Sequence, residues 1–172
     1  LGQGEYNGNY SFIHPRTGKK LVLRINTGSQ MHLEDQIGYE FTALQYLVPS
    51  GRTPKPLFCD REQGLLVMEW LPGRTLDYKT DMDEAAGILA DIHSVPVPEG
   101  CRLIRPSCPA QAIYEECLDM VQHYYDWEKR DPEVEALLRQ LVKETGNLPL
   151  TEKAGEGVPL CMVNTELNSG NF

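Results

Sequence analysis

The chain has 172 residues, enough for one large domain or two small lobes with a sizeable buried core. Its formal net charge of −9 argues against a nucleic-acid partner, because phosphate binding needs a basic surface. The same charge is compatible with a cationic small substrate, although most acidic proteins are simply soluble. No apolar run reaches membrane-spanning length and no signal peptide begins the sequence, so we expect no membrane partner and a cytoplasmic location.

The cysteine and histidine residues are scattered along the chain. The five cysteines are odd in number and include no Cys-x-x-Cys pair, which argues against a disulfide framework and against a zinc knuckle. The four histidines are also dispersed, so a histidine-based metal site has little support.

Residues 1–10 are rich in glycine and asparagine, which tolerate positive φ and let the backbone turn tightly against a ligand. We expect strands over residues 10–13 and 20–26 with a turn over residues 14–18. A glycine-rich hairpin tip of this kind can cover the phosphates of a nucleotide. In isolation, a loose terminus before a hairpin explains the pattern at least as well. The candidate ligand-binding residues at this tip are Gly4, Asn7, Gly8 and Asn9.

A cation lies in the middle of the strand over residues 20–26. Strand alternation separates Leu21, Leu23 and Ile25 on one face from Lys20, Val22, Arg24 and Asn26 on the other. Arg24 therefore lies in an apolar setting, where an unpaired charge is costly. It needs an anionic partner, either a carboxylate or a phosphate.

Residues 33–48 have the spacing of an amphipathic helix. Its apolar stripe contains Leu33, Ile37, Phe41, Leu44, Leu47 and Val48. Glu40 falls inside this stripe, and acidic side chains rarely lie on a buried helix face without a partner. We therefore predict an ion pair between Arg24 and Glu40. The alternative is a Glu40 side chain at the edge of the stripe that reaches water.

Prolines and a glycine in residues 49–56 end this helix and lead to a strand over residues 57–60. Residues 64–70 are almost continuously apolar, which predicts an internal strand covered on both faces. The run Leu71-Pro72-Gly73-Arg74 breaks this strand. A strand that ends in a Pro-Gly turn needs no ligand, and taken alone this explanation is the better one.

Three further helices are expected, over residues 81–94, 109–127 and 131–145. Asp81 or Asp83 can cap the first of them. The other two carry many acidic side chains, most of which we interpret as solvated helix faces.

The last residues combine an apolar run with a polar turn. Residues 160–163 predict a short buried strand. In the turn that follows, Glu166 precedes Asn171 by five residues. The carboxylate can accept the proton of a substrate hydroxyl and the amide oxygen can bind a magnesium ion on the phosphates, which suits phosphoryl transfer. In isolation, an acidic turn after a strand is more often an ordinary solvated loop.

The order of these features resembles the aminoglycoside phosphotransferase and choline kinase family, particularly its bacterial aminoglycoside phosphotransferase-type proteins. The resemblance covers essentially the whole chain and is carried mainly by residues 22–26, 66–73 and 168–172. In addition, Asn164-Thr165-Glu166 stands where members of that family usually have His-Gly-Asp.

The resemblance implies an α+β, protein-kinase-like fold with two lobes. Residues 1–70 would form the small, nucleotide-binding lobe, an antiparallel sheet with one helix. Residues 71–76 would form the hinge, and residues 77–172 a mainly helical and incomplete large lobe that ends in the catalytic loop. We expect both ends of the family fold to lie beyond this chain, including an Asp of the second magnesium site.

The resemblance also implies roles around a nucleotide. Arg24, oriented by Glu40, would hold the phosphates of ATP or GTP. The Glu69 carbonyl and the Leu71 amide would bind the adenine edge, with Met68 behind the base.

The catalytic residues implied by the resemblance are Glu166, as the base in place of Asp, and Asn164, in place of His. Asn171 would bind Mg²⁺. The implied function is transfer of the γ-phosphate of ATP to a hydroxyl of a small molecule, such as an aminoglycoside, choline or another alcohol. The alternative is an inactive pseudokinase, a nucleotide-binding or scaffold module, because the extra methylene of Glu166 displaces the carboxylate, which can cost ~10²-fold in rate. We expect the 172-residue chain itself to be inactive and a longer parent to transfer phosphate.

Overall fold

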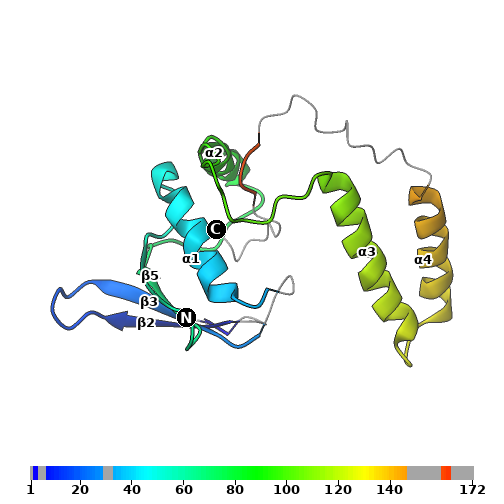
Figure 1. Ribbon diagram of the computed structural model, residues 1–172, viewed down its shortest axis with the longest axis horizontal. Helices are drawn as coiled ribbons and strands as arrows, with labels where there is room; N and C mark the ends of the chain where they lie inside the picture. The colour runs from blue at the N-terminus through cyan, green and yellow to red at the C-terminus, as the bar shows by residue number, and fades with distance from the viewer. Residues whose placement is uncertain (1, 4–6, 29–32, 147–159, 164–172) are drawn as a thin grey trace. The chain divides into compact units, whose positions relative to one another are not determined.

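The computed structural model describes residues 2–3, 7–28, 33–146 and 160–163 (Figure 1). The described residues divide into two compact units. The first contains those up to residue 103 together with residues 160–163, and the second contains those from residue 104 to 146. The lobe and hinge boundaries expected from the sequence stay a prediction.

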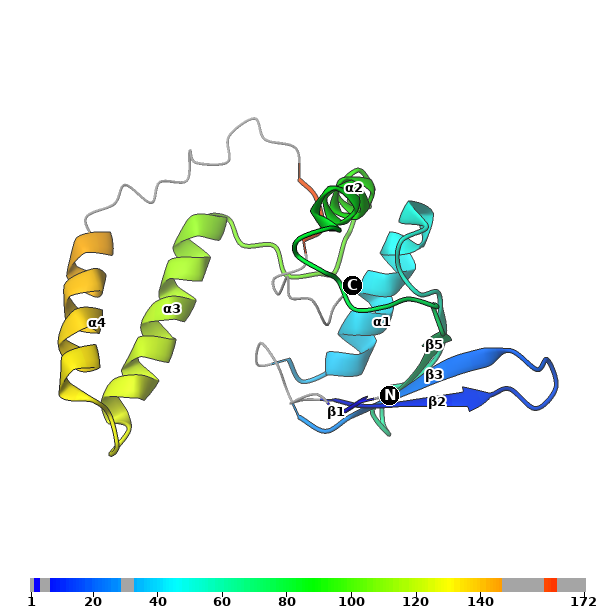
Figure 2. The same cartoon turned by 180° about the vertical axis from the view of Figure 1, so that it is seen from behind.

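Within the described residues of the first unit, five strands form one antiparallel sheet in the order β1-β2-β3-β5-β4 (Figures 1 and 2). The strands are β1 (Gly2–Gln3), β2 (Asn7–Ile13), β3 (Lys20–Asn26), β4 (Pro56–Asp60) and β5 (Leu65–Glu69). The register places Asn9 of β2 opposite Arg24 of β3, and Arg24 opposite Leu66 of β5. The predicted strand over residues 20–26 is confirmed, and the neighbouring strands differ from expectation by a few residues at their ends.

Helix α1 (Gln36–Leu47) packs on one face of this sheet. Asp35 caps it by accepting a hydrogen bond from the Gly38 N–H at 2.8 Å. The core between helix and sheet contains the buried side chains Val22, Ile37, Leu66 and Met68, with Phe41, Leu44, Cys59 and Trp70 packed against them. The helical stripe predicted from the sequence therefore faces the sheet, and strand alternation brings Arg24 to the same side as this core.

The segment that follows β5 is tied to the start of α2 (Met82–His93) through one carboxylate. Arg74 donates both Nη groups to Asp81, which also accepts from the Asp77 N–H and the Thr80 hydroxyl, each at 2.8 Å. These hydrogen bonds, that from Arg74 first, hold the pKa of Asp81 below its ordinary value. Asp81 occupies the predicted N-cap position, but its side chain does not cap α2, because the carboxylate is engaged by a bidentate guanidinium.

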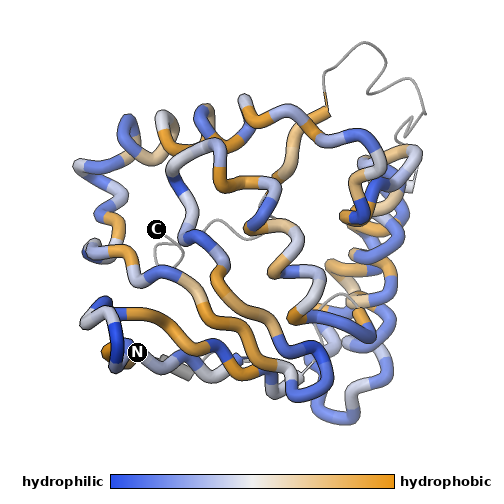
Figure 3. The backbone as a smooth tube through the Cα atoms, turned by 60° about the vertical axis from the view of Figure 1, so that its left-hand side comes forward, coloured by the Kyte–Doolittle hydropathy of each residue, from blue (hydrophilic) through white to orange (hydrophobic). Residues whose placement is uncertain are grey.

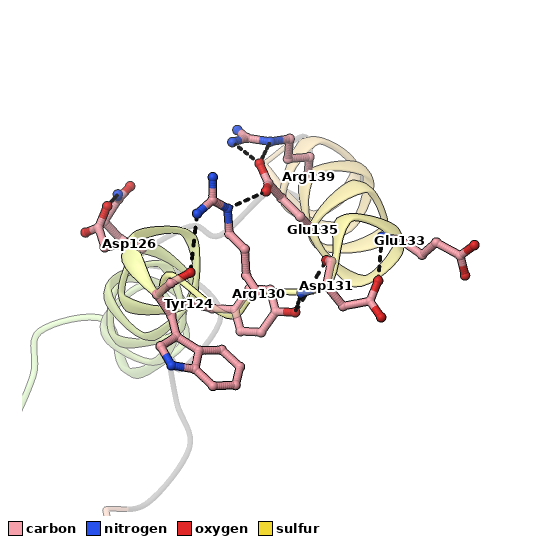
Figure 4. Close-up of polar contacts among 9 residues, drawn as sticks. Tyr124, Asp126, Arg130, Asp131, Glu133, Glu135 and Arg139 are labelled. Atoms are coloured by element: carbon pink, nitrogen blue, oxygen red, sulfur yellow. Dashed lines mark hydrogen bonds and ion pairs between the residues drawn. The ribbon is translucent and has the colours of Figure 1, made fainter.

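The second unit consists of helices α3 (Pro109–Asp126) and α4 (Pro132–Thr145), which pack side by side. Hydrogen bonds fix the turn between them (Figure 4). The Asp131 N–H donates to the Tyr124 hydroxyl at 2.8 Å, and Glu135 accepts from Arg130 at 2.7 Å and from Arg139 at 2.6 Å. Hydrogen bonds from Arg139 and then Arg130 lower the pKa of Glu135.

The expected α+β class, an antiparallel sheet with one covering helix plus further helices, is confirmed. Hydropathy alternates along the helices, as amphipathic spacing requires (Figure 3). None of the helices in the described part of the chain has the length and apolar character needed to cross a lipid bilayer.

The buried strand predicted over residues 160–163 is wrong. These residues are not in a strand, and Leu160 and Val163 are 52% and 65% exposed, whereas Met162 is buried. An apolar run becomes a strand only where another strand offers its backbone groups, and no described strand pairs with this segment.

Replacement of Leu66, whose side chain is 0% exposed, should test the core. We expect Leu66→Ala to lower the free energy of unfolding by about 3 kcal/mol, because it removes buried methyl groups and leaves a cavity. The matched control Leu57→Ala, on neighbouring β4 and 53% exposed, should cost less than about 1 kcal/mol. Urea denaturation followed by Trp70 fluorescence in a Trp127→Phe background measures both. Equal losses in the two variants would contradict the core assignment.

Candidate functional site

Three elements bring polar side chains together around Arg24. Its Nη1 donates to Glu40 Oε1 of α1, and its Nε donates to Asn9 Oδ1 of β2 at 2.8 Å. The ion pair predicted between Arg24 and Glu40 is therefore confirmed. The two side chains are 27% and 20% exposed, so the pair is half-buried and solvent still reaches it.

The local structure explains why these groups meet. On β3, Arg24 shares the α1 side of the sheet with Val22, because alternate residues of a strand point to the same face. On α1, Glu40 follows Ile37 by three residues and precedes Leu44 by four, so all three lie on the face that packs on the sheet. A sheet residue and a helix residue of opposite charge thus meet across the core.

Burial dominates the electrostatics of this pair. The loss of water around Glu40 raises the pKa of its carboxyl, and the opposing effect of the Arg24 charge is smaller. For Glu40, the loss of water therefore outweighs the attraction of the Arg24 charge, as is common for carboxylates in buried pairs. An ion pair of this kind is therefore weak evidence that the pair stabilises the fold. A role in ligand binding explains its presence better.

A second polar pair lies beside the first on the same face of the β2–β3 hairpin. Asn26 Nδ2 donates to the Gly28 carbonyl at 2.6 Å and to Asn7 Oδ1 at 3.3 Å. Asn7 and Asn26 are direct register partners, two positions along from Asn9 and Arg24. The end of the hairpin that adjoins residues 4–6 in the sequence therefore carries several amide groups next to one cation.

Gly8 lies on the other face of β2 from the candidate residues Asn7 and Asn9. Alternation places it on the face of β2 opposite Asn9, and it does not adopt a positive φ. A Cβ atom at Gly8 would come within 3.1 Å of the Tyr10 ring, so the missing side chain makes room for that ring. A direct role of Gly8 in nucleotide binding stays a prediction.

The residues predicted to hold adenine lie at and just after the end of β5. Met68 is buried in the core, and the Glu69 N–H donates to the Lys55 carbonyl at 3.0 Å. Leu71 follows the strand and is 49% exposed. Lys20 Nζ lies 4.0 Å from the centre of the Trp70 ring, a cation–π contact at the same strand end. The roles expected of Met68, Glu69 and Leu71 toward a nucleotide stay predictions.

The remaining predicted residues lie outside the described part of the chain. These are Gly4, the catalytic candidates Asn164 and Glu166, and the magnesium candidate Asn171. Among the residues that the structure does describe, no group of three or more His, Cys, Asp and Glu side chains is arranged to hold a metal ion. The catalytic and magnesium roles therefore stay predictions.

Sequence reasoning missed several contacts, among them those of Arg24 with Asn9 and of Arg74 with Asp81. The hydrogen bond from Arg24 to Asn9 follows from hairpin register, since Ile13 pairs with Lys20 and every earlier pair is then fixed. A prediction of the turn length would have found it. The Arg74–Asp81 contact has no comparable signal, because it depends on the path of an irregular segment.

Comparison with known families gives an independent result. The profile described as the phosphotransferase enzyme family matches residues 1–171, nearly the whole chain. A comparison with curated proteins found no match. The family match agrees with the resemblance drawn from residues 22–26, 66–73 and 168–172.

The raised pKa of Glu40 gives a pH-dependent prediction. A raised folded-state pKa means that the stability contributed by Glu40 is fully present below the ordinary carboxyl pKa, about 4.3, and is lost as pH rises through the raised value. The free energy of unfolding of the wild type minus that of Glu40→Gln should therefore fall from pH 4 to pH 7. Urea titrations across this range measure it, with exposed Glu62→Gln as the control for loss of a surface charge. A difference that rises with pH would show that the Arg24 charge outweighs burial.

Proposed function

The chain belongs to the phosphotransferase enzyme family, and on this premise we propose that it binds ATP or GTP together with Mg²⁺. The reaction proposed for the full-length parent is transfer of the γ-phosphate to a hydroxyl group of a small molecule. Family membership implies phosphotransferase chemistry in general. The identities of the nucleotide, the metal ion and the acceptor belong to our proposal.

The observation that carries the proposal is the half-buried pair of Arg24 and Glu40. Phosphoryl transfer depends on positioning and charge stabilisation, so a kinase-type site needs a cation held in a fixed place beside the phosphates. An arginine anchored to a carboxylate through Nη1 retains its planar donors for phosphate oxygens. The amide side chains of Asn7, Asn9 and Asn26 lie on the same face of the hairpin and make the surroundings of this cation polar.

The chemical step is assigned to the last segment of the chain. In our proposal the Glu166 carboxylate accepts the proton of the acceptor hydroxyl, whose oxygen then bonds to the γ-phosphorus. The bond from that phosphorus to the bridging oxygen breaks, and the nucleoside diphosphate leaves. Asn171 would help to hold Mg²⁺, which would supply positive charge to the phosphates. Asn164 is proposed to orient the loop in the place of the usual His.

The acceptor is proposed by chemical class only. A net charge of −9 favours cationic acceptors in solution, since long-range attraction raises their local concentration. Aminoglycosides and choline are cationic alcohols and fit this description. Neutral sugars and other alcohols fit the reaction equally well.

Removal of the Arg24 side chain should weaken nucleotide binding. We expect Arg24→Ala to raise the Kd for MgATP about 10- to 100-fold, the loss typical of hydrogen bonds to charged groups. Isothermal titration of the 172-residue chain measures it, with Arg16→Ala in the exposed β2–β3 turn as the matched control. An unchanged Kd in Arg24→Ala would contradict the assignment of Arg24 to the phosphates.

Replacement of the proposed base separates an enzyme from a pseudokinase. We expect Glu166→Gln to lower kcat by about 10²- to 10⁴-fold, because an amide cannot accept the proton, while the Kd for MgATP stays within twofold. Consumption of ATP by the full-length parent protein with a panel of hydroxylated metabolites measures turnover, and exposed Glu128→Gln is the control. Nucleotide binding without turnover on any acceptor, in wild type and variant alike, would favour the pseudokinase.

A further inference from the structure

Two different side chains hold the guanidinium of Arg24 at two points. Asn9, its cross-strand neighbour, accepts a hydrogen bond from Nε, near the base of the group. Glu40 reaches from α1 to Nη1 at the tip. A planar group held at one point can still rotate about that contact, whereas two anchors from different elements fix its position and its plane.

The two anchors differ in charge, and this matters for an anionic ligand. The Glu40 carboxylate offsets much of the positive charge of Arg24. The Asn9 amide accepts a hydrogen bond without adding negative charge. The guanidinium is thus held at two points by only one carboxylate, so its anchors add no excess negative charge that would repel a phosphate from the remaining N–H donors.

The third nitrogen shows where such a ligand would bind. Within the described part of the chain, Arg24 Nη2 has no hydrogen bond, while Nε and Nη1 each have one. The side chain is 27% exposed, so this edge can be reached. Because Nη2 lies between the two anchored nitrogens on a rigid plane, its N–H directions are set by Asn9 and Glu40 together.

We propose that Asn9 is a positioning residue: it acts through Arg24, by fixing the guanidinium plane so that Nη2 donates to a phosphate oxygen. This inference rests on the proposed function, since it deepens the role given to Arg24. The sequence suggested that Asn9 contacts the nucleotide directly. In this proposal Asn9 orients Arg24, and Arg24 contacts the nucleotide.

The affinity test is a double-mutant cycle between Asn9 and Arg24, with MgATP and adenosine as probes. Asn9→Ala should raise the Kd for MgATP about 5- to 10-fold and leave the Kd for adenosine within twofold, because only the phosphates meet Arg24. In an Arg24→Ala background the same change should alter the Kd for MgATP less than twofold. Ser11→Ala, an exposed residue on the same strand, is the matched control.

A spectroscopic test needs no nucleotide. The Arg24 Nε–H proton should exchange slowly with water in the wild type and in Ser11→Ala, because Asn9 Oδ1 shields it, and rapidly in Asn9→Ala. Asn9→Asp, which keeps the shape and an acceptor oxygen, should retain the slow exchange. This variant places a second carboxylate beside Arg24, in addition to Glu40, and the added negative charge should raise the Kd for MgATP. Nitrogen-15 NMR of the arginine side chains measures both variants, so the test holds if Asn9→Ala fails to fold.

The outcomes separate this inference from the proposed function. A rapidly exchanging Nε–H in the wild type, or an unchanged Kd for MgATP in Asn9→Ala, would overturn the inference while the proposed function stands. Equal effects of Asn9→Ala with and without Arg24 would also overturn it, because Asn9 would then bind the nucleotide itself. A wild-type chain that does not bind MgATP would contradict the proposed function, and this inference with it.

Discussion

The structure depends on the cost of placing a charge within the core of a small sheet. Arg24 lies on the face of β3 that α1 covers, beside Val22 and opposite Leu66. A charge in this position is tolerated only if it is hydrogen-bonded and paired. Glu40, on the face of α1 that covers the sheet, supplies the partner. The pair therefore links the helix that covers the sheet to the chemistry of the site. Burial raises the pKa of Glu40, and ionisable groups perturbed in this way cluster at functional sites.

The site follows from the fold through strand and helix periodicity. Alternation along β2 and β3 collects Asn7, Asn9, Arg24 and Asn26 on one side of the hairpin. The other side of the same strands carries Gly8 and the Tyr10 ring. A glycine-rich and asparagine-rich segment therefore supplies space for an aromatic ring on one face and a polar surface on the other.

Sequence patterns predicted the elements whose signal is periodic. The strand Lys20–Asn26 and the helices α1, α3 and α4 agree closely with expectation, as does the Arg24–Glu40 pair, because each depends on spacing within one element or on a charge inside an apolar stripe. The run at residues 160–163 was predicted wrongly, since strand pairing depends on a neighbour that local sequence does not specify. The roles of Glu166 and Asn171, outside the described residues, rest on resemblance alone and stay predictions.

The most direct test of the account is a crystal structure of the chain with Mg²⁺ and a non-hydrolysable ATP analogue. We predict that Arg24 Nη2 lies within about 3.2 Å of a phosphate oxygen, with Nε still on Asn9 and Nη1 still on Glu40. Phosphates bound away from this face of the β2–β3 hairpin, with the Arg24–Glu40 pair closed and untouched, would contradict it.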